Sequence, residues 1–531
     1  MGMGASSGRR RLSHLRGVRA VVCVFACITA GGCLPGADSE DGGLKAALGK
    51  FTSDEETRVN RAEKKDALIS MRAVDELGEN IASTVRSVRR AGEHLVSIDR
   101  GPSVLDAGPG LAEAEPPVIE TALAPFYASL AALEARKTEK PVTIVHLGDD
   151  HIASDRFSGD LREQFQSRFG RAGRGMLPPG VYPSRGVKFD RGGQWRALSS
   201  AEGAPGMFGA TGVKLVGSGP DAWLRLTSVD GPFDWVEVTL ETGPKQGAAI
   251  IAVDGETKTV PTAAPSADWK KIRLNRQGRE LTIRAKGDGD IKVHSWMIGS
   301  QRAGVNYVNL GLQRASALTA DRWSPSLLAA DLKSLEPNLI VLGYGTVEGF
   351  DDRLNIAAYE KRVVQIITRL KSAAPDAAVL IIGPPDAARM PDFAAAQGGG
   401  MNACRSLTAL ETARYHKWME KSDMRIARWH APPKLGEVRA ALKRIAAHTG
   451  SYFWDWSKIM GGPCGIHAWA HAQPALASGD HVQLTAEGAK RSARSLFNEL
   501  MGGYGAYANA AAAAAVSAAS RPTPVAARPK R

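Results

Sequence analysis

The chain has 531 residues, of which 44% are hydrophobic and 23% are charged, and these values are typical of a folded globular protein with more than one domain. The formal net charge of +13 is concentrated at the two ends. Residues 1–33 contain five arginines, residues 505–531 contain three arginines and one lysine, and neither segment has an acidic residue. The body between them is close to neutral, so the composition does not indicate nucleic-acid binding.

The first 33 residues have the features of an export signal. A basic stretch ends at Arg19, and an apolar run of 11 residues follows it over 20–30. This run suits a signal peptide and is too short to span a bilayer. The next residues, AGGC, resemble a bacterial lipobox with Cys33 as the lipidated cysteine, and an ordinary secretory signal cleaved nearby is the alternative. We therefore expect a periplasmic protein of the bacterial cell envelope, anchored to a membrane through a lipid on Cys33.

Two cysteines lie in the part of the chain that we expect to fold, Cys404 and Cys464. In an oxidising compartment they are candidates for a disulfide bond, and two free buried thiols are the alternative. The spacing of the cysteines does not match a metal site. We expect neither a metal nor a cofactor.

The chain divides into segments of different character. Residues 34–117 are rich in glycine and acidic residues and then in charged, helix-prone sequence, and we interpret them as a tether and a helical stalk. Helical patterns alternate with buried strands, such as 142–147, over 118–185 and 300–504, which predicts an α/β domain with a parallel sheet. We expect helices over 118–137 and from Thr485 to about Met501, and a disordered low-complexity tail over 505–531.

Residues 186–299 have a different pattern from the segments on either side. Short runs of alternating apolar and polar residues are separated by turns such as VDGP and GDGD, which is typical of an antiparallel β-sandwich. The sandwich therefore interrupts the α/β domain as an insertion. Exposed tryptophans would stack on sugar rings, although we expect most of them to fill the core. The tryptophans of this segment are Trp195, Trp223, Trp235, Trp269 and Trp296.

Four short motifs occur in order along the α/β segments. They are HLGDDH from His146, NLGLQRAS from Asn309, LGYGTVEGF from Leu342 and DHVQLTAEG from Asp480. Their order and spacing resemble those of the SGNH, or GDSL-type, hydrolases, and in particular bacterial cell-envelope esterases that act on O-acetylated peptidoglycan or polysaccharide. Those esterases also carry a carbohydrate-binding-like β-sandwich inserted after the first motif. The resemblance implies a flavodoxin-like, three-layer α/β domain, with a parallel sheet and helices on both faces.

In this family each motif supplies one working group, and the resemblance implies that all four groups are replaced here. The serine nucleophile of the first motif corresponds to Asp150. The glycine and asparagine that hold the oxyanion correspond to Arg314 and Val347, and the histidine base corresponds to Gln483. Their neighbours are retained, including Asp149, Glu348 and Asp480.

The replacements remove the chemistry of a serine hydrolase. Val347 has no side-chain donor, Gln483 cannot accept a proton near neutral pH, and an ionised Asp150 would repel an oxyanion. Loss of the nucleophile or the base alone costs about 10⁶-fold in turnover. We therefore predict a catalytically inactive protein, and we hypothesise that the side chains of Asp150 and Arg314 form an ion pair across the former site.

A rebuilt site is the alternative. Asp149, Asp150, His151, Asp480 and His481 would then gather in one cleft, to bind a divalent metal or to provide a general base. Two considerations oppose it: Asp149 is placed to cap its own turn, and neighbouring residues at a strand end usually point apart. The candidates for ligand contact are His151, Glu348, His467, Trp469 and His481.

The leading functional prediction is an inactive esterase-like protein that binds an envelope glycan, an O-acetylated polysaccharide or a protein partner. The first alternative is an active O-acetylesterase, acyl-ester hydrolase or acetyltransferase with a rearranged site that uses Asp150. The second is a structural envelope lipoprotein.

Overall fold

The computed structural model describes residues 121–395 and 403–519. The predicted signal peptide, the lipidated Cys33, and the tether and stalk over 34–117 lie outside these residues. Within the described residues, no helix has both the length and the apolar character required to cross a bilayer.

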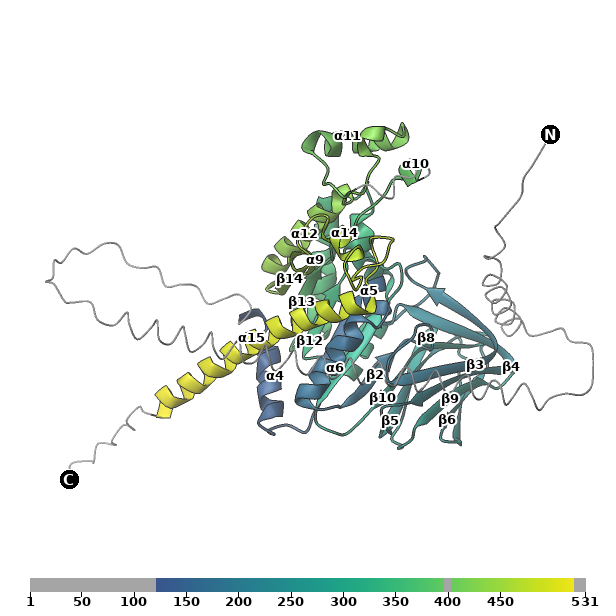
Figure 1. Ribbon diagram of the computed structural model, residues 1–531. Helices are drawn as coiled ribbons and strands as arrows, with labels where there is room; N and C mark the ends of the chain where they lie inside the picture. The colour runs from purple at the N-terminus through teal and green to yellow at the C-terminus, as the bar shows by residue number, and fades with distance from the viewer. Residues whose placement is uncertain (1–120, 396–402, 520–531) are drawn as a thin grey trace, which may run out of the picture. The chain divides into compact units, whose positions relative to one another are not determined.

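A parallel sheet of five strands forms the centre of the α/β domain (Figure 1). The strands lie in the order β11-β1-β12-β13-β14. Within this sheet, β11 is the second strand in chain order and flanks β1 on one side, while β12, β13 and β14 follow on the other side. This is the flavodoxin-like order, and its ligand crevice lies at the carboxyl ends of the first and third strands. The strands are β1 (Val142–Gly148), β11 (Val305–Gly311), β12 (Leu339–Gly343), β13 (Ala378–Gly383) and β14 (Tyr452–Asp455).

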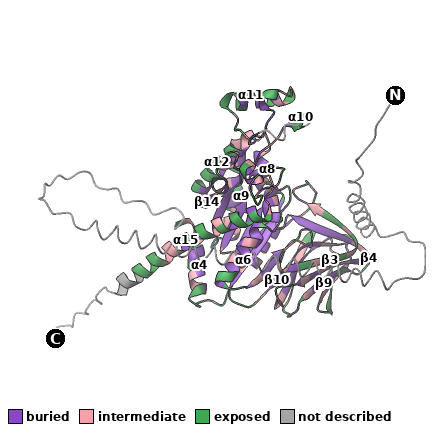
Figure 2. Ribbon diagram, viewed as in Figure 1, coloured by how far each residue is buried: buried purple, intermediate pink, exposed green. Residues whose placement is uncertain are grey.

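Helices cover both faces of this sheet, because successive side chains of each strand point to opposite faces. On one face, Val145 and Leu147 of β1 contribute to a core with α7 (Pro325–Leu335), α9 (Ile356–Ala373) and α12 (Pro433–Thr449). On the other face, Ile144 contributes to a second core with α4 (Ala124–Glu134), α6 (Phe157–Phe169) and α15 (Ala486–Ala519). Figure 2 shows the buried residues concentrated in the strands and on the inner sides of the helices.

Shorter helices connect these elements. They are α5 (Asp150–Ala153), η1 (Ala317–Arg322), α8 (Thr346–Gly349), α10 (Asp392–Ala395), α11 (Ala409–Glu420), η3 (Met424–Ile426), α13 (Trp456–Ile459) and α14 (Gly465–Ala470). A disulfide bond joins Cys404 to Cys464, immediately before α14, with their Cα atoms 5.6 Å apart.

Two helices differ from their predicted bounds. The predicted helix over 118–137 begins as α4 only at Ala124, since Pro125 suits the first turn of a helix better than its interior. The last helix does not end near Met501: α15 continues to Ala519, into the segment that we expected to be disordered. Alanine has the highest helix propensity, and Tyr504 and Tyr507 each lie 6.0 Å from the ring of Tyr127 in α4, so this extension has both a local and a tertiary cause.

The inserted strands form one antiparallel sheet of nine strands. The sheet already begins at Gly173, because β2 pairs with β10. The strands are β2 (Gly173–Leu177), β3 (Val187–Ser199), β4 (Val213–Ser228), β5 (Trp235–Thr242), β6 (Ala248–Val253), β7 (Glu256–Pro261), β8 (Asp268–Leu274), β9 (Glu280–Ala285) and β10 (Ile291–Gly299).

The long strand β4 joins the two halves of this sheet. Its first half pairs with β10 through Leu215 and its second half pairs with β9 through Leu226. Side chains from both halves, such as Val238 of β5 and Ile283 of β9, share one apolar core. The predicted sandwich is therefore a continuous sheet that folds over its own core.

Candidate functional site

Three glycines in register mark the carboxyl end of the parallel sheet. Gly148 of β1 lies opposite Gly311 of β11 and Gly343 of β12. A Cβ atom on Gly148 would lie 2.2 Å from the side chain of Ile152, and one on Gly311 would lie 2.2 Å from the backbone nitrogen of Ala153. The absence of side chains on these glycines therefore lets α5 pass close to the strand ends. Asp149 and Asp150 thus lie at the carboxyl end of β1, where the ligand crevice of this fold is found.

Asp149 forms the N-cap of α5, the capping role that we predicted for it. Its Oδ1 accepts a hydrogen bond of 3.0 Å from the backbone N–H of His151, and its own N–H donates to the carbonyl of Gly343. Burial raises the pKa of Asp149 to about 7, and the negative charge of Asp150 acts in the same direction. A buried carboxyl group of this kind supports the turn and does not face a ligand.

Asp150 points toward the end of β11. Its Oδ2 accepts a hydrogen bond of 2.7 Å from the backbone N–H of Arg314, which is the position that we assigned to an oxyanion donor. The guanidinium of Arg314 is exposed and pairs instead with Glu202, at 2.6 Å. The predicted ion pair between the side chains of Asp150 and Arg314 is therefore wrong. The two residues do meet, but through the main chain of Arg314.

Tyr182 is a site residue that the sequence analysis missed. Its hydroxyl accepts a hydrogen bond of 3.4 Å from the backbone N–H of Gln313, beside Arg314. Burial raises the pKa of Tyr182, and the charges of Asp150 and Glu202 raise it further. Tyr182 follows β2 and so brings the start of the inserted sheet to the site. No local motif marks it, since its place depends on the insertion.

Asn309 is a second residue of the site for which the sequence predicted no role. Its amide donates to the Ile152 carbonyl and to the side chains of Asp155 and Ser158, at 2.8–2.9 Å, and its carbonyl oxygen accepts from Gly311 N. The nitrogen and the oxygen of this buried amide thus both have partners. Asn309 therefore fixes α5 against the end of β11, and its position at the head of the second motif was the available signal.

The third motif supplies a buried acid and an exposed apolar residue. Val347 is 37% exposed and has no side-chain donor. Glu348 is buried, and its Oε1 accepts from the backbone N–H of Ala317 at 2.8 Å and from the hydroxyl of Tyr359 at 3.4 Å. Burial raises the pKa of Glu348 to about 7. Glu348 was a candidate for ligand contact, and the structure places it in the interior, where it joins α8 to η1.

The fourth motif begins with a turn that Asp480 stabilises. The exposed carboxylate of Asp480 accepts from the backbone N–H groups of Val482 and Gln483, at 2.9 and 3.0 Å. The carbonyl of Leu484 accepts from Arg156, which follows α5, at 2.8 Å. The segment that follows the first motif therefore contacts the fourth motif.

The side chains of the predicted rebuilt site point in different directions, although His151 lies close enough to Asp150 and Asp480 for their charges to act on it. The imidazole of His151 is buried against the indole of Trp456, with ring centroids 5.6 Å apart, while Asp150 turns toward β11. Burial lowers the pKa of His151 to about 4, so this ring is neutral near pH 7. His481 stacks on Trp429, with 3.8 Å between the ring centroids, and its Nε2 lies 3.0 Å from Nδ1 of His467.

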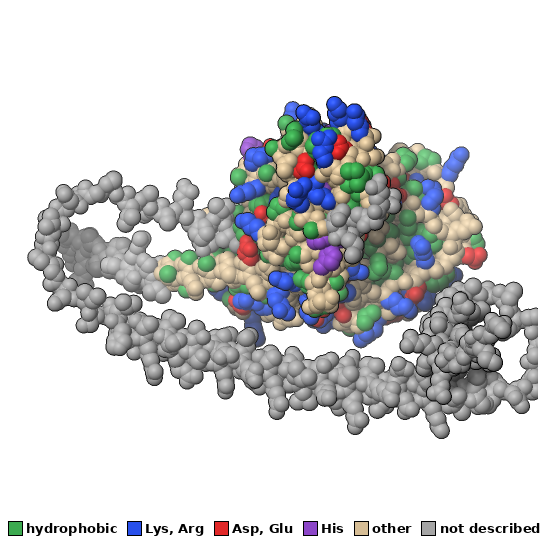
Figure 3. All heavy atoms as spheres, turned by 45° about the horizontal axis from the view of Figure 1, so that its top comes forward, with side chains coloured by type: hydrophobic (Ala, Val, Ile, Leu, Met, Phe, Trp, Pro, Cys, Tyr) green, Lys and Arg blue, Asp and Glu red, His purple; other side chains and the backbone are tan. Residues whose placement is uncertain are grey.

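His481 belongs to a cluster of three histidines with His467 and His471. Histidine side chains are visible on the face of the molecule that Figure 3 turns forward. His467 and His481 were candidates for ligand contact, and the spacing of four residues between His467 and His471 places these two on one helix face. Trp469 lies between them in the chain, but its buried ring joins the apolar core and lies against Arg491.

Four of the five tryptophans of the insertion are only half-buried, and Trp296 is fully buried. The half-buried rings are already covered in part. Trp235 lies over Gly299, and the guanidinium of Arg273 lies 3.7 Å from the centre of its ring. Trp195 lies over Gly217, and Trp223 lies over Gly192. These rings are engaged within the sheet, so they offer little free surface for stacking on a sugar.

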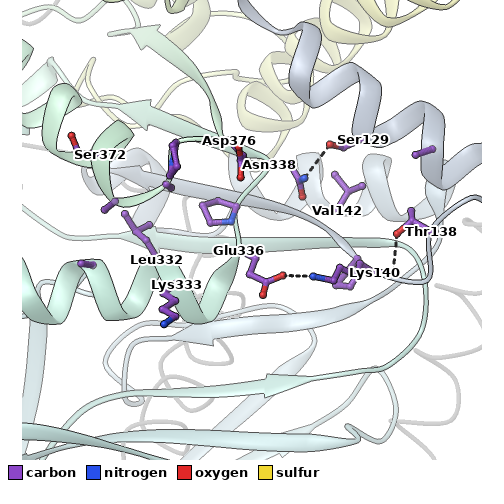
Figure 4. A pocket seen from close by; sticks show the side chains of 17 residues that line it. Ser129, Thr138, Lys140, Val142, Leu332, Lys333, Glu336, Asn338, Ser372 and Asp376 are labelled. Atoms are coloured by element: carbon purple, nitrogen blue, oxygen red, sulfur yellow. Dashed lines mark hydrogen bonds and ion pairs between the residues drawn. The ribbon is translucent and has the colours of Figure 1, made fainter.

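A wide surface cleft of about 770 Å³ lies at the opposite end of the parallel sheet (Figure 4). It is lined by Val142, at the start of β1, and by Asn338, immediately before β12. Lys140 and Glu336 form an ion pair of 3.1 Å beside it. This cleft is remote from Gly148 and Gly343 and contains none of the predicted site residues.

A second, more open groove of about 550 Å³ begins beside the site. It passes between the turn after α5 and the start of the insertion. Three of its lining side chains, those of Arg156, Arg185 and Lys188, are basic and exposed, and Tyr182 and Phe189 add aromatic surface.

Comparisons with known proteins match the fold and not the sequence. No protein-family model matches the chain, and no curated protein matches it. The structure of a peptidoglycan O-acetylesterase is similar with a TM-score of 0.58 and 23% identity, over 72% of this chain and 96% of that one. A GDSL-like lipase from Parabacteroides merdae matches with a TM-score of 0.24 and 13% identity, over 38% of this chain and 73% of that one, which is too weak to support an argument.

The solved structure that supports a comparison is thus that of an esterase. At this identity the likeness shows the fold alone: a parallel α/β domain with an inserted antiparallel sheet, which this chain shares with the peptidoglycan O-acetylesterase.

Proposed function

We propose that this chain is a catalytically inactive relative of the SGNH-type esterases that binds a glycan of the cell envelope. The observation that carries the proposal is the contact between Asp150 and Arg314. The carboxylate of Asp150 takes the position of the family's nucleophile. It already accepts a hydrogen bond from the N–H group of Arg314, which would otherwise hold an oxyanion. An acyl substrate would need both positions.

Electrostatics strengthens this proposal. A tetrahedral intermediate carries a negative charge, and two unit charges of the same sign about 4 Å apart repel by about 4 kcal/mol at an effective dielectric constant of about 20. Val347 provides no donor to offset that repulsion, and Gln483 provides no base. Each missing oxyanion donor costs about 10²–10³ in turnover.

The groove beside Asp150 supports binding of an acidic polymer. Arg156, Arg185 and Lys188 line it, and Tyr182 and Phe189 provide rings. Arg185 pairs with Asp160 and Lys188 with Asp190, so an acidic ligand would have to compete with these two exposed ion pairs. Peptidoglycan carries carboxylate groups on its peptide stems, and long basic side chains pair with carboxylates while rings stack on sugars. The similarity to a peptidoglycan O-acetylesterase points to the same class of ligand. A periplasmic location with a lipid anchor on Cys33 belongs to this proposal.

The test compares the full chain with a four-site variant, Asp150→Ser, Arg314→Gly, Val347→Asn and Gln483→His, on acetyl esters. We expect no turnover by the native chain and measurable turnover by the variant, because the variant restores all four groups on a retained scaffold. Turnover by the native chain that Asp150→Ala abolishes would contradict the proposal and assign Asp150 a catalytic task.

The same preparations test binding. We expect the native chain to sediment with insoluble peptidoglycan, and Arg185→Glu with Lys188→Glu to reduce the bound fraction severalfold, more at low ionic strength than at high. A control with the same change in net charge is Lys258→Glu with Lys361→Glu, two exposed lysines outside the groove. Equal losses in both double variants would mean that only overall charge matters, and would rule out the groove as the binding site.

A further inference from the structure

The three-histidine cluster brings together two separate segments of the chain. His467 lies in α14 and His471 caps its end, while His481 comes from the turn before α15. One ring nitrogen from each residue lies within 4.8 Å of the other two. The ring centroids are 4.4 Å apart for His467 and His471, and 5.0 Å apart for His467 and His481.

Backbone carbonyls set the tautomers of two of these rings. Nδ1 of His481 lies 2.9 Å from the carbonyl oxygen of Gly479, and Nδ1 of His471 lies 2.8 Å from that of His467. A carbonyl oxygen can only accept, so each neutral ring carries its hydrogen on Nδ1 and has its lone pair on Nε2. Carbonyls hold metal-binding histidines in the same way, because this contact orients the ring and exposes the other nitrogen.

Without a metal, Nδ1–H of His467 donates to the lone pair on Nε2 of His481, so binding zinc at this nitrogen requires the hydrogen of His467 to move to its Nε2. The spacing of the nitrogens fits coordination. Two nitrogens bound to a tetrahedral zinc ion at about 2.1 Å are roughly 3.4 Å apart. Nδ1 of His467 and Nε2 of His481 are 3.0 Å apart, so a modest separation of these two rings would accommodate the ion. His471 must approach further, and it can do so because its side chain is exposed and lies at the end of its helix.

The surroundings of the cluster are rigid on one side and open on the other. His481 is buried and stacks on Trp429, and the disulfide bond between Cys404 and Cys464 fixes the start of α14. His467 is half-buried and His471 is exposed. Three protein ligands with one open side are the arrangement in which zinc keeps a position for water or a ligand.

We propose that His467, His471 and His481 form a binding site for one zinc ion, with the fourth coordination position open to solvent. No metal was expected from the sequence, and the alternative metal site combined His481 with His151 and three aspartates, not with His467 and His471. This proposal does not rest on the proposed function, since it needs neither a glycan nor ester chemistry.

The experiment measures zinc binding to the metal-stripped full chain, prepared without a polyhistidine tag, by calorimetry and by elemental analysis after dialysis. We expect one zinc ion per chain at this site. His471→Ala should weaken its binding at least about tenfold, because a ligand is lost. Cobalt should replace zinc and give the visible absorption of a tetrahedral complex.

The control is His448→Ala, which removes an exposed histidine near the end of α12. It should bind zinc like the native chain. His448→Ala and His471→Ala both retain the cysteines near the N-terminus, so a difference in zinc affinity between these two variants reports on the histidine cluster. His467→Ala provides a second test with the buried His481 intact, and circular dichroism checks that each variant is folded. Zinc affinity that is the same in the native chain, His467→Ala and His471→Ala would overturn the proposal.

Discussion

Arg314 has a backbone conformation that ordinarily belongs to glycine. Its φ is 58°, in the left-handed region where a Cβ atom costs roughly 1 kcal/mol. A glycine at this position would adopt the same conformation without that cost. We predict that Arg314→Gly raises the free energy of unfolding by up to about 1 kcal/mol, since the relief of strain exceeds the added entropy of the unfolded chain. Urea denaturation of the full chain measures this change.

Arg314→Ala is the matched control for this prediction. It removes the ion pair with Glu202 and keeps the Cβ atom. Both partners of that pair are exposed, so its loss should change the free energy of unfolding by less than about 0.5 kcal/mol. A glycine variant no more stable than the alanine variant would contradict the assignment of strain to the backbone of Arg314.

Two buried acids make the stability of the site depend on pH. Burial raises the pKa of both Asp149 and Glu348 to about 7, above the ordinary values of 3.8 and 4.5. The folded state therefore binds protons more tightly than the unfolded state, and each acid makes folding less favourable as the pH rises from about 4.5 to 7. The buried imidazoles of His146 and His151 act in the opposite direction over a similar range, because burial lowers their pKa to about 3 and about 4.

The contribution of Glu348 is best measured as a difference between variants. We predict that Glu348→Gln gains stability relative to the native chain between pH 4.5 and pH 7.5, by about 1–3 kcal/mol, since it keeps the acceptor for Ala317 N and no longer ionises. Denaturant unfolding at a series of pH values tests this. The exposed residue Glu420 provides the control, as Glu420→Gln should show no such gain. A difference between Glu348→Gln and the native chain that does not change with pH would refute the prediction.

At the scale of elements, the sequence predicted the strands better than the ends of the helices. Residues 142–147 were predicted as a buried strand and β1 spans Val142–Gly148, because a short apolar run followed by glycine leaves few alternatives. The alternation of Val236, Val238 and Leu240 placed these residues in the core of the insertion. The extension of α15 was missed because the alanine-rich segment has no amphipathic pattern, and its contacts with Tyr127 depend on the tertiary fold.

The site was predictable in position and not in the direction of its side chains. Three of the motifs identified neighbouring strand ends, but not that Arg314 would turn to Glu202 or that His151 and Glu348 would point inward. Side-chain direction at a strand end depends on the turn that follows, and that turn is fixed by contacts remote in sequence, such as those of Asn309 with Ile152 and Asp155. The histidine cluster was missed for the same reason, since His481 reaches α14 only through the fold.

At the scale of the molecule, polar side chains connect the insertion to the α/β domain. Glu237 of β5 alternates with the apolar residues Val236 and Val238, and it is buried as they are. Lys271 of β8 lies 3.2 Å from Glu237 and 2.8 Å from Asp331 of α7. Asp331 also accepts a hydrogen bond of 2.9 Å from the backbone N–H of Ala210 in the insertion. A charged, hydrogen-bonded contact of this kind sets the position of the inserted sheet, because it is satisfied in one geometry only.

We predict that Asp331→Ala lowers the free energy of unfolding by about 3 kcal/mol or more, because it leaves the mostly buried ammonium of Lys271 without a partner on α7 and removes the acceptor of the Ala210 N–H. The double variant Lys271→Ala with Asp331→Ala should lose less than the sum of the single variants, by at least about 1 kcal/mol, since each single variant already breaks the contact between Lys271 and Asp331. Glu256→Ala breaks an exposed ion pair with Arg276 and should cost less than about 0.5 kcal/mol. Urea denaturation measures both costs. If Asp331→Ala costs no more than Glu256→Ala, the contact between Asp331 and Lys271 does not position the insertion. The insertion is then held by apolar contacts, such as those of Phe208 and Met297 with the α/β core.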